Sequence, residues 1–363
     1  MSIEINTVTK PTKRIEWIDA LRGFTMILVV FSHVRLFTFE IPIHESFVNE
    51  VFISFRMPLF FFISGFIGYK ANVEWNVRTW WTMSKKKMLI QLIPTLVFGL
   101  IFTYLYRQVG FWTFATDISK LGYWFTLVLL EMFLIMYTMN FVLYWWDKKE
   151  SRNYKLMALI ILSCAFFLAR FKYFSSLECV YNIFSFRLLF KYFPYFAFGY
   201  ICSMYKDVFN KVLSHKYFAA VVIVLFVSLF YIRRTYIAVS IDGNFSFYFL
   251  DVVLELIVGF LGLLIVYNTF RTYSDSFSSD KKVGRALQNV GKRTLDIYLL
   301  HYFFLPYLPQ IGDMLSKRGN NMALELALEG GISLWIIGIC LVVSNILRTS
   351  PILAKYLFGV KTK

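Results

Sequence analysis

The chain has few cysteines and few acidic residues, and each shortage limits the classes of protein to which it can belong. Its four cysteines among 363 residues are scattered without the spacing of metal ligands, so neither a disulfide framework nor a metal centre is predicted. Acidic residues number 22 against 38 Lys and Arg, a formal charge of +16. Such an excess can indicate nucleic-acid binding, but these basic residues lie between apolar runs. Membrane topology therefore explains them better than nucleic-acid binding does.

The sequence also lacks the marks of a secreted or modular protein. No small-residue cleavage site follows the first apolar run, and no period of 20–50 residues recurs. No stretch outside the apolar runs is long enough for a soluble domain. We predict one membrane domain over 1–363 with an uncleaved first span, a cytoplasmic segment at 1–14 and no extracytoplasmic soluble domain.

Apolar surface is what the sequence has in excess. Hydrophobic residues make up 58% of the chain and aromatic residues 20%, above the roughly 45–50% apolar content of soluble domains. Since a helix needs about 20 apolar residues to cross a bilayer, we predict an all-α polytopic membrane protein with about ten transmembrane helices: 17–38, 48–69, 88–107, 121–145, 155–171, 186–205, 217–237, 247–269, 291–311 and 325–347.

The basic residues predict the orientation of these spans. If the N-terminus is cytoplasmic and the spans alternate, 25 of the 38 Lys and Arg fall on the cytoplasmic side. This asymmetry is typical of multi-pass membrane proteins. Both termini are therefore predicted to be cytoplasmic, as an even number of spans requires.

Two ionisable side chains share one face of the first predicted span. Arg22 and His33 are 11 residues apart, within about 20° of three full turns and about 16–17 Å along a helix. Asp19, one turn before Arg22, can orient its guanidinium. Charges at membrane depth are costly and mark candidate sites. For this pair alone, an ordinary topology-setting arginine and a packing histidine stay open as the alternative.

Two further ionisable residues are predicted at the same depth. Glu131 and His301 each lie about ten residues into a span, hence about 15 Å deep and near the level of His33. We predict that the two histidines and the carboxylate belong to one site. The alternative that these three residues form a purely structural hydrogen-bonded trio stays open. Equal depth in the membrane does not show which helices are neighbours.

Other polar residues lie in the second and eighth predicted spans. Arg56 is about eight residues into the second span, and Ser64 precedes a glycine in a pattern more typical of helix packing than of chemistry. Asp251 and Glu255 are spaced i,i+4 near the outer side. They line a polar entrance or pair with a basic residue: Arg56, Arg187 or Lys191.

Taken together, these motifs resemble the integral-membrane acyltransferase 3 family. The resemblance extends from the first predicted span to the ninth and covers nearly the whole chain. It rests on the stretches "DALRGFTMILVVFSHV", "FRMPLFFFISGF", "YWFTLVLLEMF", "YFPYFAFGYIC" and "GKRTLDIYLLH".

The resemblance implies transfer of an acyl group, usually acetyl from acetyl-CoA, to a hydroxyl of a surface glycan or its lipid-linked precursor in the bacterial inner membrane. It implies that His33 is catalytic and that Arg22 binds the donor or organises the site. The implied partners are acyl-CoA, a glycan and the lipid bilayer, without nucleic acid or a permanently bound cofactor; a homo-oligomer is compatible with this.

One stretch departs from the family pattern. Many relatives have Arg-x-Arg-x-x-Pro at the start of the third span, where this chain has "SKKKMLIQLIP" with Lys85, Lys86 and Lys87. Basic charge is kept, but the bidentate guanidinium fork is not. A role in holding an anionic donor is still expected for this segment.

These residues predict a mechanism. Arg22 and the three lysines hold the donor phosphates, and His33 acts as general base, with Glu131 or His301 orienting it. The oxyanion donor is Arg56, Ser64 or Tyr298, which the sequence does not rank.

The alternative is a transporter or flippase. In that case His33, Glu131 and His301 would couple protons or substrate at mid-membrane.

Overall fold

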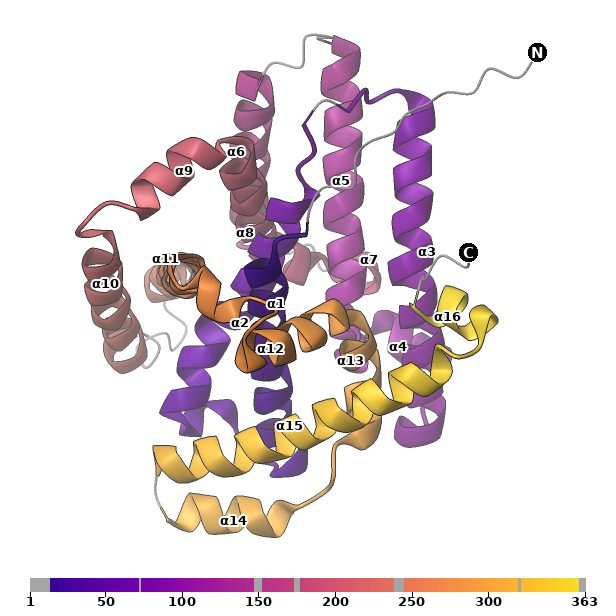
Figure 1. Ribbon diagram of the computed structural model, residues 1–363, viewed down its shortest axis with the longest axis vertical. Helices are drawn as coiled ribbons and strands as arrows, with labels where there is room; N and C mark the ends of the chain where they lie inside the picture. Colours follow the sequence, from indigo (N-terminus) through magenta and orange to yellow (C-terminus); the bar gives the residue numbers. More distant parts are fainter. Residues whose placement is uncertain are drawn as a thin grey trace.

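The computed structural model describes residues 14–71, 73–146, 152–172, 177–237, 245–318 and 321–358, which form helices and no strand (Figure 1). Eight helices of this part are long and apolar enough to cross a membrane. Three of them combine an α-helix with a π-helical end. The eight helices are Glu16–Thr38 (α1, η1), Phe47–Gly68 (α2), Val77–Arg107 (α3, η3), Trp124–Trp146 (α5), Arg152–Ala169 (α6), Phe218–Ile237 (α10, η6), Phe245–Thr272 (α11) and Met322–Leu347 (α15). The predicted all-α polytopic membrane fold is confirmed. Of the predicted segment 1–14, only Arg14 lies within the described residues.

Shorter helices complete the bundle. In Figure 1, α3 and α5 run side by side while α15 crosses the bundle obliquely and α11 is seen nearly end-on. The other elements are α4 (Phe111–Thr116), α7 (Glu178–Ile183), α8 (Phe186–Met204), α9 (Lys206–Leu213), α12 (Lys282–Lys292), α13 (Thr294–Leu300), α14 (Pro309–Lys317) and α16 (Pro351–Phe358), with 3₁₀ turns η2 (Ile43–Glu45), η4 (Lys120–Gly122), η8 (Ser274–Phe277) and η9 (His301–Phe304).

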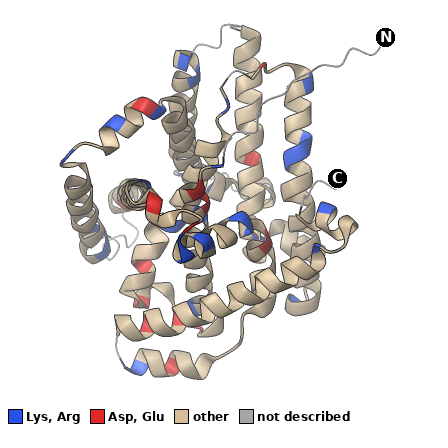
Figure 2. Cartoon of the chain, in the orientation of Figure 1, with Lys and Arg blue, Asp and Glu red and all other residues tan. Residues whose placement is uncertain are grey.

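The long helices follow directly from composition. α10 contains no charged residue and α5 contains one, Glu131, and Figure 2 shows how much of the ribbon is free of charge. Three helices begin at a side-chain cap. Ser46, Asn76 and Asn321 each accept a hydrogen bond from a backbone amide three residues later, which satisfies one of the free amides of a first turn.

Two predicted spans differ from the eight helices. The segment 186–205 forms α8, a 19-residue helix that is less apolar because it carries Arg187 and Lys191. The segment 291–311 is not one helix, which corrects the prediction. α13 ends at Leu300, a 3₁₀ turn follows, and residues 305–308 are non-helical. Pro306 and Pro309 explain the break, because proline cannot donate within a helix and disfavours a helical residue before it.

This broken segment still runs beside the first helix from end to end. Thr294 accepts a hydrogen bond from Arg22 at 2.9 Å near the start of α1. The amide of Leu308 donates to the carbonyl of Thr38 at 2.8 Å, where η1 ends. His301 lies between these two attachments, at the point where the α-helix ends.

Glycines set the closest helix contacts. A Cβ added at Gly65 of α2 would lie 2.0 Å from the carbonyl oxygen of Phe196 in α8, and one added at Gly199 of α8 would lie 2.0 Å from that of Phe62. α1 and α12 meet in the same way at Gly23 and Gly291. The packing interpretation of the glycine that follows Ser64 is therefore confirmed, since only small residues allow such an approach.

Candidate functional site

Two histidines from opposite ends of the chain meet inside the bundle. His33 is the last residue of α1 and His301 begins the turn after α13. The Nδ1 atom of His33 lies 2.8 Å from Nε2 of His301, and the two rings are nearly parallel, at 8°. The predicted proximity of these residues is therefore present in the fold.

A backbone carbonyl fixes the protonation pattern of the neutral pair. Nδ1 of His301 lies 3.0 Å from the carbonyl oxygen of Ile297, which can only accept. His301 Nδ1 therefore carries the proton, and its Nε2 is an acceptor. His33 Nδ1–H then donates to His301, which leaves Nε2 of His33 with a free lone pair. His301 is fully buried whereas His33 is partly exposed.

An arginine lies beside the histidine pair. Arg56 Nη1 donates to the carbonyls of Leu28 and Val29 at 3.2 and 3.3 Å, and its charge acts on both histidines. Its Nε is buried without a hydrogen-bond partner, and among the described residues it forms no ion pair with a carboxylate. A guanidinium held by backbone carbonyls keeps its positive charge for another group.

A cavity of about 450 Å³ opens at the end of the bundle where α1 begins. Four basic side chains line it: Arg22, Lys70, Lys86 and Lys87. Desolvation and the neighbouring charge of Lys86 lower the pKa of Lys70 from its ordinary value, as expected where cations gather without an anion. Further inside, the lining is mostly apolar and includes Val29, one helical turn before His33.

The predicted orientation of Arg22 agrees with the structure. Asp19 is buried, and its Oδ1 lies 3.8 Å from Nη1 of Arg22. The second terminal nitrogen of Arg22 donates to Thr294. Carboxylate and hydroxyl therefore hold the guanidinium at the wall of the cavity.

The predicted lysine trio is only partly in place. Lys86 and Lys87 line the cavity, whereas Lys85 is exposed and outside it. The ammonium of Lys87 lies 3.4 Å from the centre of the Phe133 ring, a cation–π contact. Consecutive residues of a helix point 100° apart, so three adjacent lysines cannot face one cavity.

Glu131 is not brought to the histidine pair. α5 packs against α3 and α8, whereas α1 packs against α12, α2 and α15. Both carboxyl oxygens of Glu131 are buried without a hydrogen-bond partner among the described residues. Equal depth was therefore insufficient to predict contact.

The three candidate oxyanion donors differ in the hydrogen bonds and charges around them. Tyr298 lines the cavity, but its hydroxyl donates to the carbonyl of Gly122 at 2.9 Å and accepts from the amide of Phe125 at 3.1 Å. Its proton is thus already engaged, which argues against an oxyanion role. Ser64 lines the cavity on α2. Arg56 has the charge and an unpartnered nitrogen beside the histidines.

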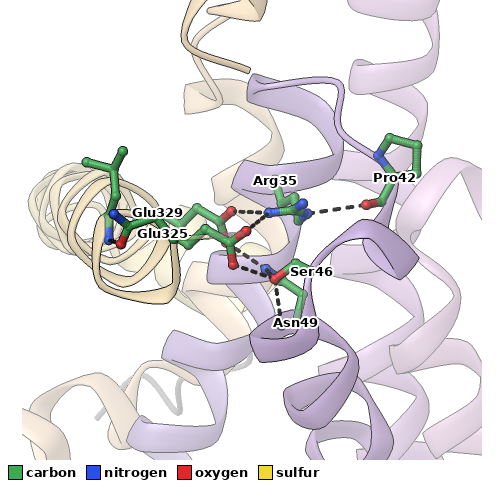
Figure 3. A network of polar contacts seen from close by, with 8 residues as sticks. Arg35, Pro42, Ser46, Asn49, Glu325 and Glu329 are labelled. Atoms are coloured by element: carbon green, nitrogen blue, oxygen red, sulfur yellow. Dashed lines mark hydrogen bonds and ion pairs between the residues drawn. The ribbon is translucent and has the colours of Figure 1, made fainter. Parts of the chain in front are cut away.

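Sequence reasoning missed a buried ionic network just beyond His33 (Figure 3). Arg35 lies between Glu325 and Glu329 of α15, with Nη1 at 3.3 and 2.9 Å from their carboxylates. Ser46 donates to Glu325 at 2.6 Å and Asn49 to Glu329 at 2.7 Å. These contacts attach the end of α1 to α15. Two carboxylates spaced i,i+4 within an apolar run were the available signal.

The ion pairs of Asp251 and Glu255 were predicted in part. Glu255 forms ion pairs with Lys191, one of its three predicted partners, and with Arg170 at 2.8 Å. Asp251 pairs instead with Arg233 at 2.8 Å. Arg56 takes part in neither pair.

Comparison with known proteins identifies the family of the chain. A family model named for acyltransferase 3, and described as an acyltransferase domain, matches residues 15–347. The chain is similar to the glucans biosynthesis protein C of Salmonella paratyphi B, Salmonella dublin and Salmonella enteritidis PT4, with 22% identity over 236 residues in each case. These matches cover 54% of this chain and 60% of each relative, less than two thirds of the relatives' length. No solved structure matches the chain.

The helical membrane fold and the family match together place the chain among multi-pass membrane proteins that carry an acyltransferase domain. More particularly, the chain belongs to the acyltransferase 3 family.

Proposed function

We propose that this acyltransferase moves an acetyl group from cytoplasmic acetyl-CoA to a hydroxyl of a surface glycan, or of its lipid-linked precursor, in the bacterial inner membrane. The observation that carries the proposal is the hydrogen-bonded chain from Ile297 through His301 to His33, with its 3.0 and 2.8 Å contacts. The similarity to proteins named for glucan biosynthesis supports a glycan acceptor.

The cation-lined cavity is the proposed donor site. Coenzyme A carries anionic phosphates, for which Arg22, Lys70, Lys86 and Lys87 supply charge-assisted hydrogen bonds. Arg22 lies about 16–17 Å from His33 along the helix, a distance of the order of the extended pantetheine arm. The apolar inner lining then surrounds the arm and directs the thioester toward the histidine pair.

His33 is the proposed general base. As the acceptor oxygen bonds to the thioester carbon, its proton passes to Nε2 of His33. The tetrahedral intermediate collapses with cleavage of the carbon–sulfur bond, and the imidazolium returns the proton to the departing thiolate. Acyl ester and free thiol result, with no net proton released. His301 orients His33 and accepts a hydrogen bond from its Nδ1–H, in the position that the aspartate holds in a catalytic triad, and so favours the imidazolium.

Arg56 is the proposed oxyanion donor. The tetrahedral intermediate bears a negative oxygen, and a guanidinium that pairs with no carboxylate among the described residues stabilises such a charge. The two carbonyls that hold Nη1 fix its position in advance. Ser64, on the cavity wall, is the second candidate.

Replacement of the base tests the proposal. Purified His33→Ala in detergent, with radiolabelled acetyl-CoA and a glucan oligosaccharide, should lose about 10²–10⁴-fold in turnover. His215→Ala is the matched control, because His215 is exposed and lies between α9 and α10, outside the lining of the cation-lined cavity. A folded His33→Ala protein with near wild-type turnover would rule out the general-base role.

The transporter alternative predicts a different outcome in the same preparation. Substrate counterflow in liposomes would continue without acetyl-CoA, whereas an acyltransferase incorporates label only from the donor. No described contact favours transport, since Glu131 does not join the two histidines.

A further inference from the structure

The histidine pair lacks the carboxylate that stabilises the cation of a catalytic triad. Among the described residues, no carboxylate is hydrogen-bonded or ion-paired to either imidazole. Arg56 acts on both rings, and its positive charge opposes a second cation beside it. The proposed proton transfer nevertheless makes His33 an imidazolium inside the bundle, where a charge is costly. An uncharged group with negative potential beside the pair would offset this cost.

The ring of Tyr302 lies against both histidines. Its centre is 4.1 Å from the centre of His301 and 5.1 Å from that of His33, with angles of 39° and 31° between the planes. At 4.1 Å two rings meet by their faces, since edge contacts hold ring centres further apart. Both distances are within the roughly 6 Å range of a cation–π contact. One tyrosine ring therefore serves both imidazoles, which are themselves nearly parallel.

Neighbouring groups hold the ring of Tyr302 in this place. The residue is buried, and the rings of Tyr123 and Phe102 pack on it at 5.3 and 5.5 Å. Its hydroxyl donates a long hydrogen bond, of 3.4 Å, to the carbonyl of Gly122. A Cβ at Gly122 would lie 2.4 Å from this hydroxyl, so the ring fits because a glycine is there. The hydroxyl is thus engaged elsewhere, and the ring is what contacts the histidines.

An aromatic face attracts a cation through its negative electrostatic potential, and the attraction is stronger away from water. When Nε2 of His33 takes the acceptor proton, the imidazolium lies 5.1 Å from the centre of the Tyr302 ring. This attraction arises as the cation forms and is absent before. It therefore lowers the barrier to proton transfer without strengthening the binding of either substrate.

We infer that Tyr302 is a positioning residue of the acyl transfer, whose ring holds the histidine pair and stabilises the imidazolium of His33 by a cation–π contact. This inference rests on the proposed function and adds to it the group that compensates for the missing carboxylate. Tyr302 acts through the histidines and not on the substrate. Its hydroxyl takes no part in the reaction.

Two substitutions separate the ring of Tyr302 from its hydroxyl. With the full-length protein in detergent, labelled acetyl-CoA and a glucan oligosaccharide, Tyr302→Phe should keep the kcat of wild type. Tyr302→Leu removes the aromatic face and should lower kcat about 10–30-fold, with the KM for acetyl-CoA unchanged. Phe303→Leu is the matched control, because Phe303 lies in the same turn but its ring contacts neither histidine. Equal losses in Tyr302→Phe and Tyr302→Leu would overturn the role of the ring.

Fluorinated phenylalanines at position 302 test the electrostatic part of the inference. Each fluorine withdraws electrons from the ring face and weakens its attraction for a cation, while the shape of the ring changes little. The kcat values for phenylalanine and its mono-, di- and trifluorinated forms should therefore fall stepwise, which a packing role would not produce. This series stays informative even if Tyr302→Leu fails to fold.

The outcomes distinguish this inference from the proposed function. Equal kcat across the fluorinated series, beside an active wild type and an inactive His33→Ala, would overturn the cation–π contact and leave the acyl transfer standing. Absence of acetyl transfer by the wild-type protein would instead contradict the proposed function.

Discussion

His33 and His301 are chemically identical, but their surroundings give them different tasks. His301 is fully buried and has both ring nitrogens engaged, by Ile297 and by His33. It cannot reach an acceptor hydroxyl without losing one of these contacts. His33 keeps one nitrogen free and is partly exposed. In the proposed mechanism, the residue that transfers the proton is thus distinct from the residue that positions it.

Substitution of His301 separates positioning from mere packing. His301→Phe keeps an aromatic ring but removes the acceptor for His33 Nδ1–H, so kcat should fall about 10²-fold with the KM for acetyl-CoA unchanged. His301→Gln offers an amide oxygen and should recover part of this loss. Steady-state kinetics over a range of pH give the measurement. Equal activity of His301→Phe and wild type would contradict the positioning role.

At the scale of elements, the helices were predictable wherever composition alone decides. Apolar runs such as 217–237 became helices because a membrane-spanning backbone must satisfy its own hydrogen bonds. The break in the segment that follows His301 was not predicted, although Pro306 and Pro309 in the sequence indicate it. Glu131 was misplaced for another reason: depth follows from position along a span, but the neighbours of α5 do not. Arg35 and Glu329, 294 residues apart, could not be paired from sequence for the same reason.

Close helix contacts give a prediction for stability. Gly65→Leu introduces a side chain where even a Cβ would lie 2.0 Å from a carbonyl of α8, so the helices must separate at a cost of about 1–3 kcal/mol or more. Gly338→Leu in α15 is the control, because nothing lies within 4 Å of its Cβ position. Thermal unfolding in detergent should show a lower Tm for Gly65→Leu alone. Equal Tm values would refute close α2–α8 packing.

At the scale of the whole molecule, the cation-lined cavity opens at one end of the bundle, where α1 begins. The end bearing Arg22 and the lysines is the end that basic residues assign to the cytoplasm. Acetyl-CoA is strongly anionic and does not cross a bilayer unaided. The side from which the proposed donor enters is therefore a property that intact vesicles can reveal.

Vesicle orientation provides the measurement. With labelled acetyl-CoA added outside and glucan present on both sides, inverted membrane vesicles should incorporate acetyl groups and right-side-out vesicles should not. Detergent treatment of the right-side-out vesicles should restore incorporation, which controls for loss of enzyme. Activity of sealed right-side-out vesicles equal to that of inverted ones would reverse the assigned orientation.

The broken segment beside α1 has a mechanical consequence. It is attached to α1 at Arg22–Thr294 and again at Thr38–Leu308, with the histidine pair between the two attachments. Because the two segments are joined on both sides of the histidine pair, neither can slide along the other without breaking one of these hydrogen bonds. The spacing of the two imidazoles is therefore expected to stay constant when substrates enter and leave. A helix that packs elsewhere, such as α10 on α11, can therefore be substituted without changing the distance between the two imidazoles.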